Sequence, residues 1–229
     1  MLVLSRRGED YEIAYKHKSG SREYELSAYR ESVTNAALTM SSPDGLYSGG
    51  DLLPDLFSGS SIFDAGDYKT IGYTAAVTQN AGDHFSGTLM YGSGGVLTAE
   101  RRTIESGSPD DLRSMIRASR RNAVTARISA VSPWSGTHFI ASYQWADNRW
   151  AVTPGHLYST DTVRPVPGMN LYIRQPIPTF AGLPWRMEAT ADLRNLLAQG
   201  YLPLSLTDGR QVLLMQTPRS FRGGLSFIF

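Results

Sequence analysis

Histidine is the residue type in this sequence most suited to acid–base chemistry or metal binding, and the chain has four of them. They are His17, His84, His138 and His156, and none stands in a HExxH motif or another spacing typical of metal ligands. Isolated histidines of this kind usually line a loop or a lumen, so we expect no metal site. The chain has no cysteine, which excludes disulfides, thiolate metal sites and cysteine nucleophiles.

Two acidic motifs could in principle activate a water molecule. Asp83-His84 joins a carboxylate to an imidazole, and Asp110-Asp111 joins two carboxylates. Omptin proteases, which are outer-membrane barrels, use an acid pair together with an Asp–His pair for this purpose. A general base must lie within hydrogen-bond reach of its partner, so this hypothesis depends on where the fold places the two motifs.

Two further motifs resemble catalytic or binding sites only superficially. His138 and Ser142 would share one face of a strand, but they are four residues apart, which is too far for a direct serine–histidine pair. The run 92–95 is rich in glycine, yet it lacks the Lys-Ser/Thr of a phosphate-binding loop and opens no helix. We therefore expect a protein that is not an enzyme and binds no cofactor.

Composition excludes several classes of partner and leaves the membrane open. The 229 residues carry a formal net charge of +1, and the basic residues are spread along the chain, which argues against nucleic acid. No run of about 18 apolar residues exists, so a spanning helix is not expected. Membrane-spanning strands are shorter and only half apolar, and this composition allows them.

Strict alternation of apolar and polar residues predicts about nine strands, each about ten residues long, as transmembrane strands require. The alternating segments are 11–16, 23–28, 70–78, 85–91, 124–130, 138–145, 169–174, 185–194 and 221–229. The second face of these strands is polar and charged. It carries Glu12, Glu23, Glu25, Arg127, Arg174, Arg186, Glu188, Asp192 and Arg194.

The connections between the strands alternate in length. Tight turns are expected at 18–21, 80–83, 133–136 and 179–184, and long loops at about 31–68, 93–119, 146–167 and 196–218. Short periplasmic turns and long extracellular loops are the asymmetry of an outer-membrane barrel. This topology puts Asp83-His84 and Asp110-Asp111 about 30 Å apart, on opposite sides of a membrane, which excludes a joint catalytic site.

Some local structure is expected inside the loops. Ser108-Pro109-Asp110-Asp111 has the residues of a helix start, and an apolar face of Leu112, Met115 and Ile116 follows. An Asp-Gly pair at 208–209, between the strand-like runs 201–206 and 211–216, predicts a hairpin. The segment 41–66 is rich in Ser, Gly and Asp and is expected to be a long exposed loop.

Aromatic residues are expected to mark the edges of the membrane. The four tryptophans, Trp134, Trp145, Trp150 and Trp185, lie near strand ends, and we interpret them as interfacial girdles in preference to core residues.

The last strand combines strict alternation with an aromatic end. Its apolar face is formed by Phe221, Leu225, Phe227 and the terminal Phe229. This pattern resembles the C-terminal signal by which outer-membrane barrels are recognised for assembly. We therefore predict the barrel-assembly machinery and outer-membrane lipid as partners of this strand.

The end of the chain also resembles a particular family of barrels. The run 191–197, followed by the closing strand 219–229, is similar to the end of TonB-dependent receptors, most of all those with a carboxypeptidase-regulatory-like N-terminal domain. Receptors of this family have a barrel of 22 strands that encloses a plug domain. The resemblance implies energised uptake of a nutrient across the outer membrane, and contact with the TonB complex through the plug domain.

The sequence therefore predicts an all-β protein, an antiparallel up-and-down transmembrane β-barrel segment of nine to ten strands that spans residues 1–229. The first ten residues lack the apolar region of a signal peptide, so we expect the C-terminal part of a larger barrel, without plug domain and N-terminal strands. The predicted location is the cell outer membrane of a Gram-negative-type envelope. The alternatives are a soluble all-β binding module and a stand-alone barrel such as a porin.

Overall fold

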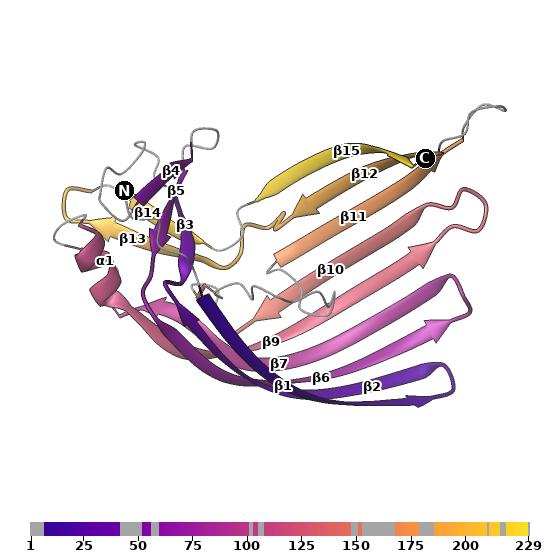
Figure 1. Ribbon diagram of the computed structural model, residues 1–229, viewed down its shortest axis with the longest axis horizontal. Helices are drawn as coiled ribbons and strands as arrows, with labels where there is room; N and C mark the ends of the chain where they lie inside the picture. The colour runs from indigo at the N-terminus through magenta and orange to yellow at the C-terminus, as the bar shows by residue number, and fades with distance from the viewer. Residues whose placement is uncertain are drawn as a thin grey trace.

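Nine antiparallel strands form one curved sheet, and neighbours in the sheet follow each other in chain order (Figure 1). The strands are β1 (Arg7–Ser19), β2 (Arg22–Thr34), β6 (Tyr68–Ala81), β7 (Phe85–Ala99), β9 (Ile116–Val131), β10 (His138–Ala146), β11 (Gly168–Ile177), β12 (Arg186–Arg194) and β15 (Ser220–Ile228). The computed structural model describes residues 7–41, 52–55, 60–100, 103–104, 108–147, 151–152, 168–178, 186–209, 211–215 and 219–228. The predicted all-β, antiparallel arrangement of nine strands is confirmed, and β1 and β15 are the two edges of an open sheet.

The strands of this sheet are staggered in one direction. A row of paired residues begins at Ser19, beside the turn that ends β1, and reaches Phe221, near the opposite end of β15. Between them the row passes through Arg22, Gln79, Gly87, Ile128, Ala141, Leu171 and Leu193. The paired positions therefore shift steadily along the strands from one edge of the sheet to the other.

Short and long connections lie at opposite ends of the sheet (Figure 1). Residues 20–21, 82–84 and 132–137 are the short turns, close to the positions predicted, while the turn predicted at 179–184 lies outside the described residues. The loops predicted at 31–68 and 93–119 are shorter in the structure than the sequence analysis expected. β2 extends to Thr34, β7 extends to Ala99, and β9 begins at Ile116, because alternation continues beyond the segments used for prediction.

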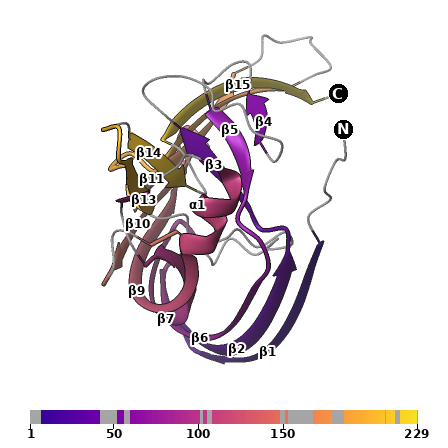
Figure 2. The same cartoon turned by 90° about the vertical axis from the view of Figure 1, so that its left-hand side faces the viewer.

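A second sheet of six short strands covers the end that bears the long connections (Figure 2). Its order is β4-β5-β3-β14-β13-β8, with β3 (Ala37–Ser41), β4 (Leu52–Asp55), β5 (Ser60–Asp64), β8 (Thr103–Ile104), β13 (Tyr201–Leu206) and β14 (Gln211–Met215). The expectation of one exposed loop at 41–66 is therefore wrong for its described part. Pairing of β5 with β3 buries Phe63 completely, which a local count of Ser, Gly and Asp could not anticipate.

Two local predictions within the loops are confirmed. The helix α1 (Pro109–Met115) is capped by Ser108, whose side chain accepts a hydrogen bond from the Asp111 backbone N–H at 3.2 Å. The run 201–206 pairs with residues 211–215 of the second predicted run as the hairpin of β13 and β14, with Gly209 in the turn at a φ of 88°.

The hydrophobic core lies beneath this six-stranded cap, and not between two faces of the larger sheet. Leu112 of α1 and Leu204 of β13 are fully buried there, together with Phe63. The ends of the long strands join the same cluster through Val33, Tyr68, Leu97 and Ile116. The cap is thus a packed unit anchored on the sheet, since it shares one core with four of the long strands.

Tyr29 lies flat against the inner face of the sheet because two glycines leave room for its ring. Tyr29 pairs with Gly72 across β2 and β6. A Cβ added to Gly72 would lie 2.3 Å from the Tyr29 ring, and one added to Gly94 would lie 2.1 Å from its hydroxyl. The ring therefore covers the backbone of two neighbouring strands, which compensates for the missing glycine side chains.

Asn195 holds the long-loop end of β12 in place. Its side chain is fully buried, donates to the Gln199 carbonyl and accepts from the Gln199 N–H, both at 2.8 Å. Its backbone N–H donates to Asn170 at 2.8 Å, and its φ of 51° is one that asparagine tolerates. Gly168 packs against it, because a Cβ there would lie 2.5 Å from the Asn195 side-chain oxygen.

We expect Asn195→Ala to lower the free energy of unfolding by about 2–3 kcal/mol, since it leaves two partly buried backbone groups of Gln199 without these partners. Gln199→Ala is the matched control, because only the backbone of Gln199 takes part in these bonds, and it should change stability little. Urea unfolding in detergent, followed by circular dichroism, compares the two. Equal losses in both variants would contradict this role for Asn195.

Candidate functional site

The convex face of the nine-stranded sheet is covered with exposed apolar side chains. Apart from Ile62, Trp134 and Leu197, every exposed large hydrophobic side chain among the described residues lies on this face. Examples from three strands are Ile13, 76% exposed, Leu26, 57% exposed, and Phe221, 71% exposed. An apolar surface that continues across nine strands needs an apolar environment or a partner to cover it.

Aromatic residues lie toward both ends of this apolar face. Tyr24, Phe85, Phe139 and Phe227 lie near the short-turn ends of their strands. Tyr73, Tyr143 and Trp145 lie nearer the long-loop ends, and Tyr91 lies near the middle of β7. The rings of Tyr73 and Tyr91 are neighbours, with centroids 6.1 Å apart. Two aromatic zones that flank aliphatic side chains form the pattern of interfacial girdles.

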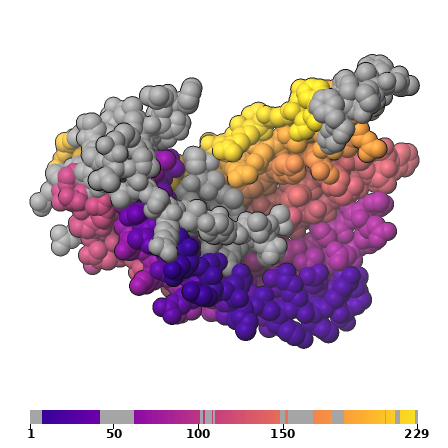
Figure 3. Space-filling model, viewed as in Figure 1, coloured from indigo at the N-terminus to yellow at the C-terminus, as the bar shows by residue number. Residues whose placement is uncertain are grey.

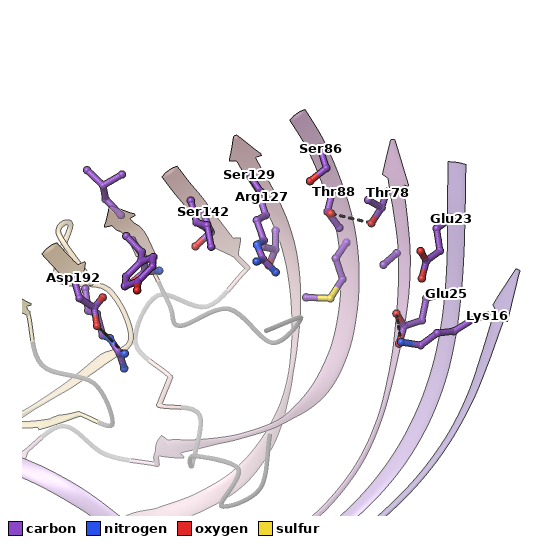
Figure 4. Close-up of a pocket in the computed structure, with 18 residues that line it drawn as sticks. Lys16, Glu23, Glu25, Thr78, Ser86, Thr88, Arg127, Ser129, Ser142 and Asp192 are labelled. Carbon is purple, nitrogen blue, oxygen red and sulfur yellow. Dashed lines mark hydrogen bonds and ion pairs between the residues drawn. The ribbon is translucent and has the colours of Figure 1, made fainter. Parts of the chain in front are cut away.

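The concave face is polar and encloses a wide cavity of about 610 Å³ (Figures 3 and 4). Every strand of this sheet except β15 contributes side chains to its lining. The polar ones are Lys16, Glu23, Glu25, Thr78, Ser86, Thr88, Thr125, Arg127, Ser129, Ser142, Asn170, Tyr172, Asp192 and Arg194. This cavity, bounded by the wall of strands, is the candidate functional site.

Cross-strand contacts between side chains organise the concave face. The hydroxyls of Thr78 and Thr88 lie 2.9 Å apart across β6 and β7, and those of Ser27 and Thr74 lie 2.7 Å apart across β2 and β6. Each pair follows from backbone register, because the two residues are direct partners in the ladder. Such cross-strand pairs satisfy the hydroxyl groups of partly buried side chains and contribute to the stability of the sheet.

Charged residues on the concave face are largely paired with opposite charges. Lys16 lies 3.3 Å from Glu25 across β1 and β2, and Arg194 lies 2.8 Å from Asp192 within β12. A longer contact of 3.9 Å joins Arg174 to Glu188. The cavity has cations and anions in equal number, so it favours polar solutes or a polar protein surface over ions of one sign.

The polar residues predicted from alternation lie on this face, and the structure adds several that charge alone does not reveal. Glu23, Glu25, Arg127, Asp192 and Arg194 all line the cavity as their alternation predicts. Lys16, Thr78, Thr88, Ser129 and Asn170 also line the cavity, as their places in the alternating segments predict, although the sequence-based list of charged residues did not include them. Each of these residues either pairs with a predicted polar residue across the ladder or lies an even number of positions from one on its own strand. Alternation therefore places it on the same face.

The candidate catalytic residues remain apart. Asp83-His84 lies in the turn between β6 and β7, while Asp110-Asp111 lies in α1, beyond the far end of the 15-residue strand β7. At about 3.3 Å per residue that strand is roughly 45 Å long, so the two motifs lie at opposite ends of it and outside hydrogen-bond reach of each other. His17 and His84 are exposed, His138 is partly buried on β10, and His156 lies outside the described residues. Among the described residues, no cluster of three or more His, Asp or Glu side chains could hold a metal ion.

The aromatic girdle residues and the C-terminal assembly residues predicted from the sequence are exposed wherever the structure describes them. Trp145 is 53% exposed on the convex face, but Trp134 lies in the turn between β9 and β10, 96% exposed, so it belongs to a turn and not to a strand. Phe221, Leu225 and Phe227 lie on the convex face of β15, each more than half exposed. Trp150, Trp185 and Phe229 lie outside the described residues.

Comparison of the chain with protein-family models, with curated proteins and with solved structures finds no match. Within the described residues, no helix has the length and hydropathy needed to cross a membrane. The functional argument therefore depends on the two faces of the nine-stranded sheet.

We expect Thr78→Val to cost roughly 0.5–1 kcal/mol in the free energy of unfolding, since it leaves the Thr88 hydroxyl without its partner. Thr78→Val combined with Thr88→Val should cost less than the sum of the single changes, because no hydroxyl is then left unpaired. Ser129→Ala lines the same cavity and serves as the control. Additive losses in the urea-unfolding cycle would mean that the two threonines do not interact.

Proposed function

We propose that the nine-stranded sheet is part of the wall of an outer-membrane β-barrel, with its convex face in lipid and its concave face toward the lumen. The observation that carries this proposal is the separation of the two faces, apolar and exposed outside, polar and cross-linked by hydrogen bonds inside. Such a wall hides its backbone groups in the ladder, as a hydrocarbon environment requires.

A soluble sandwich explains the same alternation less well. It requires Phe221 and Phe227 to be buried against a second sheet about 10 Å away. They are 71% and 52% exposed, and the six-stranded sheet covers one end of the wall instead of its convex face (Figure 2). Tyr73 and Phe139 are also exposed on that face. Burial in lipid accounts for all four residues at once.

Strand direction favours a larger barrel over a stand-alone barrel of nine strands. β1 ends at a short turn, and β15 begins at a long connection, so both run toward the short-turn end. Direct pairing of these two edges would be parallel, whereas every other ladder in this sheet is antiparallel. Antiparallel closure calls for an odd number of further strands between them, and the 22-stranded receptor type meets that condition with 13.

In the proposed function, this wall belongs to a receptor of the TonB-dependent type that takes up a nutrient across the outer membrane. Coupling to the TonB complex would then require a plug domain in the lumen. The polar, charge-balanced concave face supports contact with a polar plug surface or a polar solute. A porin is the alternative, and it would leave the same cavity filled with water.

Single-cysteine labelling tests the orientation of the wall without background, because the chain has no cysteine. We expect Leu26→Cys and Leu225→Cys, reconstituted in lipid bilayers, to react with a bilayer-soluble maleimide and to be protected from a charged thiol reagent. Ser86→Cys and Ser142→Cys, on the concave face, should not react preferentially with the bilayer-soluble reagent. All four should react alike in denaturant. Fast reaction of Leu26→Cys or Leu225→Cys with the charged reagent in bilayers would disprove the lipid-facing assignment.

We expect Phe227→Asn to reduce the amount of folded protein in the outer membrane several-fold, because it removes an exposed aromatic side chain from the closing strand. Ser226→Asn, on the concave face of the same strand, is the matched control and should assemble normally. The measurement is the fraction with heat-modifiable gel mobility in membranes from expressing cells. Similar yields for both variants would show that this side chain is not part of an assembly signal.

A further inference from the structure

A basic groove lies on the convex face, on the long-loop side of the apolar zone. It has a volume of about 610 Å³ and is lined by Arg30, Lys69, Thr70, Ile71, Gly95, Ala118, Ser119 and Arg120. These residues come from β2, β6, β7 and β9. We call this site the basic groove.

The groove forms where two neighbouring strands separate. The ladder between β6 and β7 ends at the pair Tyr73 and Ser93, although β6 begins at Tyr68 and β7 continues to Ala99. β7 meanwhile stays paired with β9 as far as Ala99, so the separation opens on the β6 side of β7. A break in the ladder creates a depression in an otherwise continuous wall.

Backbone register brings three cations to this depression. Arg30 is the direct partner of Ile71 across β2 and β6, and Lys69 lies two residues from Ile71 on the same face. Arg120 faces it from the other side, as the partner of Gly95 across β7 and β9. All three basic side chains are exposed.

The three cations have no carboxylate partner among the described residues, in contrast to the cations of the concave face, where Lys16 and Arg194 have one. The acid in the same row is Glu9, which is separated from Lys69 by Ser32. Three like charges around one groove repel each other, so the groove favours an anionic ligand.

The surroundings indicate what kind of anion fits. Ile71, 63% exposed, lies at the edge of the groove, and Tyr73 continues the apolar face below it. A ligand seated here meets arginine and lysine at one end and apolar side chains at the other. Arginine binds phosphate oxygens with two parallel hydrogen bonds, and basic sites beside a bilayer bind anionic head groups.

We propose that the basic groove binds the phosphate groups of an anionic lipid in the outer leaflet, whose acyl chains lie along the apolar face. This inference rests on the proposed membrane function, because it takes the convex face to be in contact with lipid. Arg30, Lys69 and Arg120 hold the phosphates, and the side chains of Ile71 and Tyr73 contact the upper part of the acyl chains. The bound lipid would therefore lie where β6 and β7 separate.

Lipid binding can be measured in mixed detergent micelles, whether or not the protein inserts into bilayers. The probe is a lipid built on a glucosamine disaccharide with two phosphates, compared with its dephosphorylated form and with inorganic phosphate. The variant is R30Q/K69Q/R120Q, and the matched control is K18Q/R22Q/R186Q, which removes three exposed cations near the short-turn end. Circular dichroism and heat-modifiable mobility check that both remain folded.

We expect native mass spectrometry to show the phosphorylated lipid bound to the original chain and to the control variant. Binding should fall by about fivefold for each single neutralisation and by more than thirtyfold for R30Q/K69Q/R120Q. Equal binding by both triple variants, equal binding of the dephosphorylated lipid, or equal binding of inorganic phosphate would overturn the proposal. Flotation of the chain with liposomes is scored separately, so failure to insert would count against the membrane function while the micelle assay still decides on the groove.

Discussion

Backbone pairing between antiparallel neighbours is the constraint on which the rest of this structure depends. Partners in a ladder lie on the same face of the sheet, and side chains alternate along each strand. One row therefore joins Tyr15, Leu26, Ala75, Tyr91, Val124 and Trp145 from six strands on the convex face. A slip of one residue at any ladder would place charged residues such as Glu25 or Arg127 among them, so the burial of one face and the polarity of the other enforce each other.

The location of the core separates two kinds of stability in this chain. The cap has a core of its own, built from α1, the short strands and the ends of four long strands. The described part of the wall has no comparable core, since its large convex side chains are exposed and its concave ones are mostly polar. The wall is therefore held together by its ladders and cross-strand contacts, and its apolar face gains its full stabilisation only in contact with lipid, as we propose, or with another apolar surface.

The two faces of the sheet and the basic groove are consistent with one proposed position of the sheet in a membrane. The aromatic residues toward the strand ends bracket an aliphatic zone. Arg30, Lys69 and Arg120, which have no carboxylate partner among the described residues, lie beyond it on the side of the cap. On the concave face, Lys16 and Arg194 each lie beside a carboxylate instead. Charge is thus balanced toward the cavity and unbalanced at the convex edge, where the proposed lipid phosphates would neutralise it.

Local patterns in the sequence were enough to predict the nine strands, the faces of Glu25, Arg127 and Phe221, the helix at Ser108 and the hairpin at 208–209, because each depends on neighbours within a few residues. The burial of Phe63, the bonds of Asn195 to Asn170 and Gln199, and the gathering of Arg30, Lys69 and Arg120 could not be predicted. These features join segments that are distant in the chain, and they depend on where each ladder stops and how the long connections pack. Alternation is a property of the chain itself, whereas the cap, the stagger and the groove were decided by tertiary pairing.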